Sequence, residues 1–144
     1  MRPVQRGFRI GGLGEIAIRC ADLVAMTAFY RDIIGLEPLG ENAERRIVFL
    51  KVADGYRGHT AIVALFADDG FAPGSPSSLH HLALSTGHDE QDAALAWFTA
   101  HGLEPRVEHF DWIGWRGVFV HDPEGNVVEI VAKIPTGQST FVTT

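Results

Sequence analysis

The sequence has little cysteine, no excess of basic residues and no long apolar run, and each shortage excludes a class of protein. Cys20 is the single cysteine of 144 residues, which excludes an internal disulfide or a multi-cysteine zinc site and suits a reducing cytoplasm. Twelve scattered Lys and Arg stand against 18 Asp and Glu, so nucleic acid is not an expected partner. No run could span a bilayer, and the basic N-terminus lacks a signal peptide's apolar core, so we expect a cytoplasmic protein without a membrane partner.

Signatures of phosphate binding and of nucleophilic catalysis are also missing. The chain has neither a Gly-rich phosphate loop nor a Gly-x-Ser-x-Gly elbow. Strand alternation places its one thiol, on Cys20, on the face opposite to Glu15. Nucleophilic catalysis therefore has no support in the sequence.

The sequence does contain a repeated pattern of secondary structure. A strand, a helix and three further strands are predicted twice along the chain. The clearest helix, at 23–34, has apolar residues at three- and four-residue steps, follows the capping candidate Asp22 and ends at Gly35. Strands are indicated by alternating or β-branched runs between turn-rich segments. The predicted elements are strands at 15–20, 36–39, 46–52 and 60–67 with the helix at 23–34, then strands at 79–85, 103–108, 115–121 and 127–132 with a helix at 89–101.

Matching residues in the two halves indicate a tandem duplication. The run Gly-Leu-Glu-Pro at 35–38 recurs 67 residues later, residues 15–18 align with those 66 positions further along, and Ala64 aligns with Glu129 at an offset of 65. One four-residue identity could arise by chance, but three matching pairs in the same order with nearly constant offsets favour a duplication. We therefore predict an α+β fold in which two tandem βαβββ modules form a partly open, curved mixed sheet around a central cavity.

The duplication also predicts how the chain is divided. The connector is the segment rich in Gly, Pro and Ser between the two patterns. The predicted parts are an N-terminal arm at 1–12, a first module at 13–67, the connector at 68–78, a second module at 79–133 and a C-terminal tail at 134–144.

Glu129 is the anomaly among the predicted strands. It is the one charged residue of the apolar run 127–132, which follows a tight turn at 122–126. A buried carboxylate without a partner is costly, so Glu129 requires a cation, hydrogen-bond donors or an open cavity.

Two further side chains with metal-ligand chemistry occupy matching places in the repeat. Glu15 and His81 hold aligned positions in the first strands of the two halves, on faces that could converge with Glu129. One imidazole and two carboxylates are a competent site for a divalent ion such as Fe²⁺, Mn²⁺, Ni²⁺ or Zn²⁺. For each residue alone, a solvent-facing glutamate or a hydrogen-bonded histidine is the competing interpretation. Alternation predicts that His80 faces away from His81.

Aromatic and other histidine side chains surround these candidates without a settled role. Phe49 and Phe119 occupy similar places in the two halves, and Trp115 shares the face of Phe119; core packing and a cavity wall are both open. The loop at 110–114 could close the mouth of the cavity. The strand-end histidines, namely His59 and His109, stay open as accessory acid or base groups, and His121 is expected at the surface.

Taken together, these residues resemble the vicinal oxygen chelate superfamily, which includes glyoxalase I, extradiol dioxygenases, methylmalonyl-CoA epimerase, and fosfomycin and bleomycin resistance proteins. The resemblance covers residues 13–133, and its most specific part is the run Asp-Pro-Glu-Gly-Asn-Val-Val-Glu at 122–129. It implies that metal ligands come from the first and last strands of each module. Those positions are held here by Glu15, Ala64, His81 and Glu129.

The resemblance also sets expectations for activity. The ligand set lacks the second histidine of Fe²⁺ extradiol dioxygenases and, at Ala64, the fourth ligand of glyoxalase I. It implies a metal-dependent enzyme acting on a small substrate chelated through vicinal oxygens, with Glu15 or Glu129 as the candidate base, and a homodimer whose site lies within one chain or across two. Lyase or isomerase chemistry is favoured. An Fe²⁺ extradiol dioxygenase and a metal-free, ligand-sequestering protein of the bleomycin-resistance type stay open.

Overall fold

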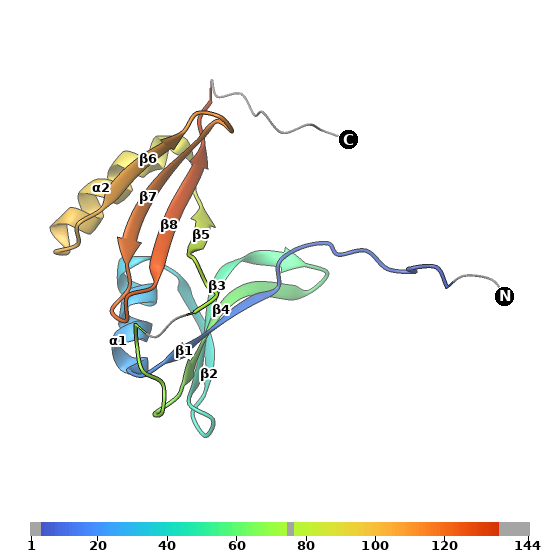
Figure 1. Cartoon of the computed structure of the whole chain (residues 1–144). Helices are drawn as coiled ribbons and strands as arrows, with labels where there is room; N and C mark the ends of the chain where they lie inside the picture. Colours follow the sequence, from blue (N-terminus) through green and yellow to red (C-terminus); the bar gives the residue numbers. More distant parts are fainter. Residues whose placement is uncertain (1–3, 75–76, 136–144) are drawn as a thin grey trace.

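The strands form two mixed four-stranded sheets, one from each half of the chain (Figure 1). The computed structural model describes residues 4–74 and 77–135, so the first three residues of the predicted arm and nearly all of the predicted tail lie outside it. The α+β fold of two βαβββ modules is confirmed. Hydrogen bonding separates the strands of the two modules into two sheets.

The first module contains one helical segment and four strands. Its sheet has the order β1-β4-β3-β2, with β1 parallel to β4 and the other neighbours antiparallel. The elements are β1 (Glu15–Cys20), α1 (Leu23–Ala28) continued by a π-helical turn (Phe29–Ile33), β2 (Glu37–Asn42), β3 (Ile47–Tyr56) and β4 (His59–Ala67).

The second module repeats that plan. Its sheet has the order β5-β8-β7-β6, again with one parallel pair, β5 and β8. The elements are β5 (Leu82–Ser85), a 3₁₀ turn (His88–Glu90), α2 (Gln91–Ala100), β6 (Arg106–Phe110), β7 (Trp115–His121) and β8 (Val127–Lys133). Identical strand order in both halves supports the predicted duplication.

The helix ends follow the predicted chemistry. The Asp22 side chain accepts a hydrogen bond from the Ala25 backbone N–H at 3.0 Å and so caps α1. Gly35 and Gly102, which follow the two helical segments, have φ of +91° and +79°. Glycine adopts this left-handed conformation without steric cost, so both helices stop where the sequence predicts.

The strand bounds differ from prediction at the β3–β4 hairpin. We predicted strands that end at residue 52 and begin at residue 60, with a turn between them, but β3 runs to Tyr56 and β4 starts at His59. Arg57 and Gly58, with φ of +49° and +87°, complete a two-residue turn. Gly55, also at positive φ, lies where the β3–β4 register shifts, so the predicted turn residue forms an irregularity inside a longer strand.

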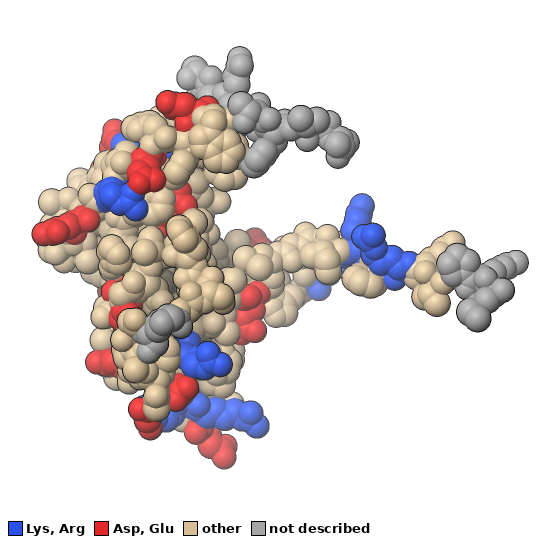
Figure 2. Space-filling model, viewed as in Figure 1, with Lys and Arg blue, Asp and Glu red and all other residues tan. Residues whose placement is uncertain are grey.

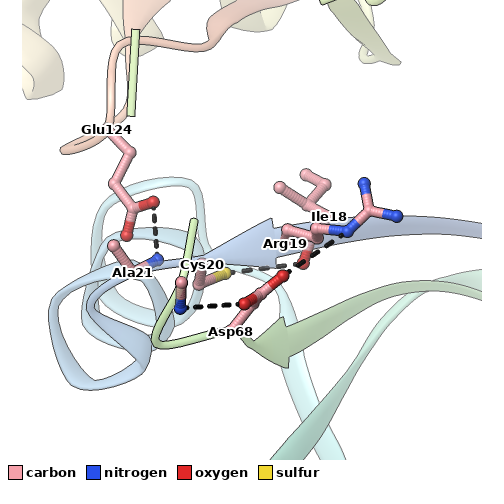
Figure 3. A network of polar contacts seen from close by, with 7 residues as sticks. Ile18, Arg19, Cys20, Ala21, Asp68 and Glu124 are labelled. Atoms are coloured by element: carbon pink, nitrogen blue, oxygen red, sulfur yellow. Dashed lines mark hydrogen bonds and ion pairs between the residues drawn. The ribbon is translucent and has the colours of Figure 1, made fainter. Parts of the chain in front are cut away.

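The two modules share one hydrophobic core and are joined by polar contacts. The buried cluster draws on both halves, from Ile18 and Met26 to Phe98 and Val128. Glu124, in the turn between β7 and β8, accepts hydrogen bonds from the backbone N–H groups of Ala21 and Asp22 at 2.9 and 2.8 Å. Figure 3 shows this carboxylate reaching down to the segment that connects β1 to α1.

The N-terminal arm projects away from the modules (Figures 1 and 2). It carries basic side chains, among them Arg6 and Arg9, while acidic groups are spread over the modules (Figure 2). No helix in the described residues is long and apolar enough to cross a membrane.

Candidate functional site

The site is built around a contact between His81 and Glu129. Nε2 of His81 lies 3.1 Å from Oε1 of Glu129. Glu129 is in β8, an inner strand of its sheet, and is only 5% exposed. His81 immediately precedes β5, which is the parallel neighbour of β8. The buried carboxylate therefore has the compensating partner that physical chemistry requires.

Phe119 places an aromatic ring beside this pair. It is the β7 partner of Glu129, so the two side chains share one face of the sheet. The ring centroids of Phe119 and His81 are 6.1 Å apart in an edge-on arrangement. On its other side, Phe119 is paired with Arg106 of β6, whose guanidinium carbon lies 4.6 Å from the ring centroid. The row of partners across the sheet is Arg106, Phe119, Glu129 and Ala83.

Gly117 leaves the space that the Glu129 carboxylate fills. A Cβ at position 117 would lie 2.3 Å from Oε2 of Glu129 and 2.7 Å from Cε2 of Phe119. The φ of Gly117 is outside the left-handed region, so backbone conformation does not require glycine here. Sequence reasoning did not identify Gly117, although a glycine inside a strand is a signal of close approach.

His80 contradicts the predicted alternation. Its Nδ1 lies 2.8 Å from Nδ1 of His81, so the two imidazoles approach each other. The prediction that they face apart was wrong because β5 begins only at Leu82, and both histidines precede the regular strand. One of the two nitrogens must carry the proton in this contact.

Glu15 does not join His81 and Glu129. It lies in β1 of the first sheet, paired with Ile62, and its side chain is exposed. Within residues 4–74 and 77–135, no three His, Cys, Asp or Glu side chains are grouped so that they could hold a metal ion. One chain thus brings together two of the three predicted ligands. Glu15 instead lines a cavity of about 530 Å³, with Arg19, His80 and Asn126 in its wall.

The first module has no counterpart to the His81–Glu129 pair. Ala64 pairs with Phe49 and Ala17 as Glu129 pairs with Phe119 and Ala83, so the aligned positions are equivalent. Ala64 is 0% exposed and offers no ligand. As the sequence predicts, the first module therefore lacks a side-chain ligand at the position equivalent to Glu129.

The remaining predicted residues lie at different distances from the pair. Phe119 is buried beside it, Phe49 is half-buried in the first sheet, and Trp115 is 42% exposed at the start of β7. His109 pairs with Arg116 on the face of β6 opposite to Arg106, so it points away from Glu129. The other two strand-end histidines, His59 and His121, are exposed.

Asp122 shapes the turn that leads to Glu129. Its carboxylate accepts hydrogen bonds from the backbone N–H groups of Glu124 and Asn126, both at 2.9 Å, and from the Tyr30 hydroxyl at 2.7 Å. Burial and the neighbouring Asp122 raise the pKa of Tyr30 well above its ordinary range, so it remains a neutral donor. The predicted turn thus also attaches the second module to the first.

Residues 12–130 match the model of the Glyoxalase/Bleomycin resistance protein/Dioxygenase superfamily. The chain belongs to this superfamily. No curated protein matches it significantly.

Solved structures share the fold over nearly their whole length. A glyoxalase/dioxygenase from Nostoc punctiforme is 21% identical with a TM-score of 0.69, covering 92% of this chain and 98% of that one. Lactoylglutathione lyase from Agrobacterium tumefaciens is 25% identical with a TM-score of 0.63, covering 86% and 95%. A fosfomycin resistance protein from Listeria monocytogenes is 21% identical with a TM-score of 0.66, covering 85% and 91%.

Proposed function

We propose that this protein is a divalent-metal-dependent enzyme that acts on a small substrate chelated through vicinal oxygens, with lyase or isomerase chemistry. The observation that carries the proposal is the buried Glu129 carboxylate in contact with His81, on a sheet face that also carries Phe119 and Arg106. The superfamily is named for glyoxalases, bleomycin resistance proteins and dioxygenases, so the proposed activity lies within its range.

The donors present fit a divalent ion. An imidazole nitrogen and a carboxylate oxygen are ligands that Fe²⁺, Mn²⁺, Ni²⁺ and Zn²⁺ all accept. His81 and Glu129 would hold the ion, and Glu15 is the proposed third ligand. When bound, the ion would act as a Lewis acid on a substrate oxygen. Phe119 walls the site on the β7 side, and Trp115 and Phe49 are the other proposed wall residues.

Glu15 reaches this site in a homodimer, in which β1 of one copy faces β5 and β8 of its partner. Two features support this arrangement. Glu15 and Ala17 expose one face of β1, and Ala83 is exposed beside Glu129 on the second sheet. A site assembled across two copies would use both exposed faces, as closed symmetric dimers commonly do.

The carboxylates also supply the proton chemistry of an isomerase or lyase. Glu129 is shielded from water. Its carboxylate contacts His81 and occupies the space that the missing side chain of Gly117 leaves. Glu15 is exposed and free to move toward a substrate carbon. Either carboxylate can accept a proton next to a polarised carbonyl, and we assign this role to Glu15 and Glu129.

Metal content tests the proposal. The protein is purified without added metal and then loaded separately with Fe²⁺, Mn²⁺, Ni²⁺ or Zn²⁺. Elemental analysis measures its metal content beside that of His81→Ala, Glu129→Ala and Glu15→Ala. We expect binding in the wild type, its loss in the first two variants, and weaker binding in the third. Glu41→Ala, which removes an exposed glutamate from β2, serves as the matched control. A wild type that binds none of the four ions would overturn the proposal.

A second candidate is a metal-free protein that sequesters a ligand. The observation in its favour is that His81 already compensates the buried Glu129 at 3.1 Å. It predicts ligand binding without any metal and no turnover. An Fe²⁺ extradiol dioxygenase, by contrast, predicts oxygen uptake with a catechol, and the single histidine in contact with Glu129 makes it the less favoured enzyme.

A further inference from the structure

Arg106 is held on the site face with its guanidinium over Phe119. The guanidinium carbon lies 4.6 Å from the centroid of the Phe119 ring, within the range of a cation–π contact. Phe119 is the direct partner of Glu129. Since neighbouring strands are about 4.8 Å apart, the Arg106 and Glu129 backbones are separated by roughly 10 Å, about the length of a small substrate.

Neighbouring side chains fix the Arg106 guanidinium and leave part of it open. Glu108, two residues along β6 and on the same face, forms an ion pair with it. Phe110 packs edge-on against Phe119, with 6.3 Å between their ring centroids. The Arg106 side chain is still 57% exposed. A guanidinium has five N–H donors in a fixed plane, so donors remain for a ligand.

The first module shows that this cation is not part of the shared scaffold. The row equivalent to Arg106, Phe119 and Glu129 is Gly40, Phe49 and Ala64. The aromatic residue is present in both rows, whereas the arginine and the glutamate occur together in the second row alone. The phenylalanine is thus common to both modules, and the two charged residues distinguish the second.

We infer that the substrate carries an anionic group, such as a carboxylate, that binds Arg106 across the Phe119 ring from the chelated oxygens. The inference rests on the proposed function for the position of the chelating end. A planar or extended acid would lie along Phe119, with its anion on the guanidinium and its vicinal oxygens toward His81 and Glu129. Arg106 thus selects acids over neutral compounds of the same shape.

Two matched probes test the inference, catechol and 3,4-dihydroxybenzoate, which share the vicinal oxygens and differ by one carboxylate. Their dissociation constants are measured by calorimetry with Mn²⁺-loaded and metal-free protein. The wild type should bind the acid about tenfold or more tightly than catechol, the size of one charge-assisted hydrogen bond. Arg106→Gln should lose this preference while its affinities for catechol and Mn²⁺ stay unchanged.

Two further variants separate recognition from general charge effects. Arg31→Gln removes an arginine that is likewise exposed and paired with an acidic residue, but it lies on the helical segment after α1, and the preference should persist. Glu108→Gln removes the carboxylate that competes for Arg106, so acid binding should tighten. Equal affinity of the wild type for both probes, or equal loss of both in Arg106→Gln, overturns the inference. Failure to bind any of the four ions while the metal-free preference for the acid persists overturns the proposed function and upholds Arg106.

Discussion

The two modules have the same strand order and equivalent partners around Ala64 and Glu129, but the corresponding sheet faces carry different side chains. The first sheet presents Gly40, Phe49 and Ala64 in a row where the second presents charged residues on either side of a phenylalanine. The two sheets thus share a scaffold, and the row of charged residues occurs in the second sheet. Topology therefore does not distinguish the two sheets, whereas the side chains of one row do.

A second pair of positions differs in a compensating way. Gly117 makes room for Glu129 in the second module, and Ile47 occupies the place of Gly117 in the first, diagonal to Ala64. Large and small residues are thus exchanged between the two positions. The summed volume of the two side chains is therefore roughly the same in both modules, as close packing requires.

The largest effect is expected when the Glu129 carboxylate is copied into the first module. Ala64→Glu places a charge at a fully buried position next to Ile47, without a histidine to compensate it. The free energy of unfolding should fall by about 3–5 kcal/mol, the range found for uncompensated buried charges. Urea denaturation measures it. Ala43→Glu, in the exposed turn between β2 and β3, should change stability by less than about 0.5 kcal/mol; similar losses in both variants would contradict the comparison.

Gly117→Ala fills the space that the Glu129 carboxylate occupies. The added methyl group displaces the carboxylate, so affinity for Mn²⁺ should fall by about tenfold or more, while the fold is kept because only side-chain ends must move. Calorimetry and the melting temperature report the two quantities. Gly40→Ala is the control, since a Cβ there meets open space. Unchanged Mn²⁺ affinity in a folded Gly117→Ala protein would remove the role given to this glycine.

A smaller loss is expected at the bond that joins the modules. Tyr30→Phe removes the hydroxyl that donates to Asp122 at 2.7 Å in a buried setting. Stability should fall by about 1–2 kcal/mol, because the Asp122 carboxylate loses one of its donors. Tyr56→Phe, at the exposed hairpin end of β3, should be nearly neutral. A neutral Tyr30→Phe would show that this hydrogen bond does not help to hold the modules together.

The smallest effect is absent at neutral pH and appears in alkali. Burial raises the pKa of Cys20 from its ordinary value near 9 to about 12, and position 86, its equivalent in the second module, is a threonine that does not ionise. Between pH 9 and 12 the unfolded thiol loses its proton first, so unfolding becomes easier as pH rises. Stability measured by urea denaturation at pH 7, 9 and 10 should therefore decline less in Cys20→Ala than in the wild type. Parallel declines would rule out this source of alkaline sensitivity.

Much of the fold could be predicted from the sequence because its signals are local. The strand at Trp115–His121, the cap at Asp22 and the glycines after each helix follow from alternation and capping chemistry. The equivalence of Ala64 and Glu129 followed from the repeat. By contrast, the long β3–β4 hairpin depends on Arg57 adopting positive φ, which composition does not signal.

The candidate site was predictable in part. His81 and Glu129 meet because His81 immediately precedes β5, the parallel neighbour of the strand that carries Glu129, and the repeat indicates this neighbourhood. Glu15 lies on the other sheet, and sequence gives no measure of the distance between sheets. Arg106 was missed because its importance comes from a cross-strand partner, Phe119, whose register no local pattern reveals.

The reach of Glu124 to Ala21 and Asp22 has a consequence for how the chain acquires its structure during synthesis. These hydrogen bonds join residues 103 and 102 positions apart. The amides that precede α1 have to wait for this partner until the ribosome has made most of the second module. A nascent chain halted at the connector therefore lacks these two hydrogen bonds, while Asp22 can already cap α1 through the Ala25 amide.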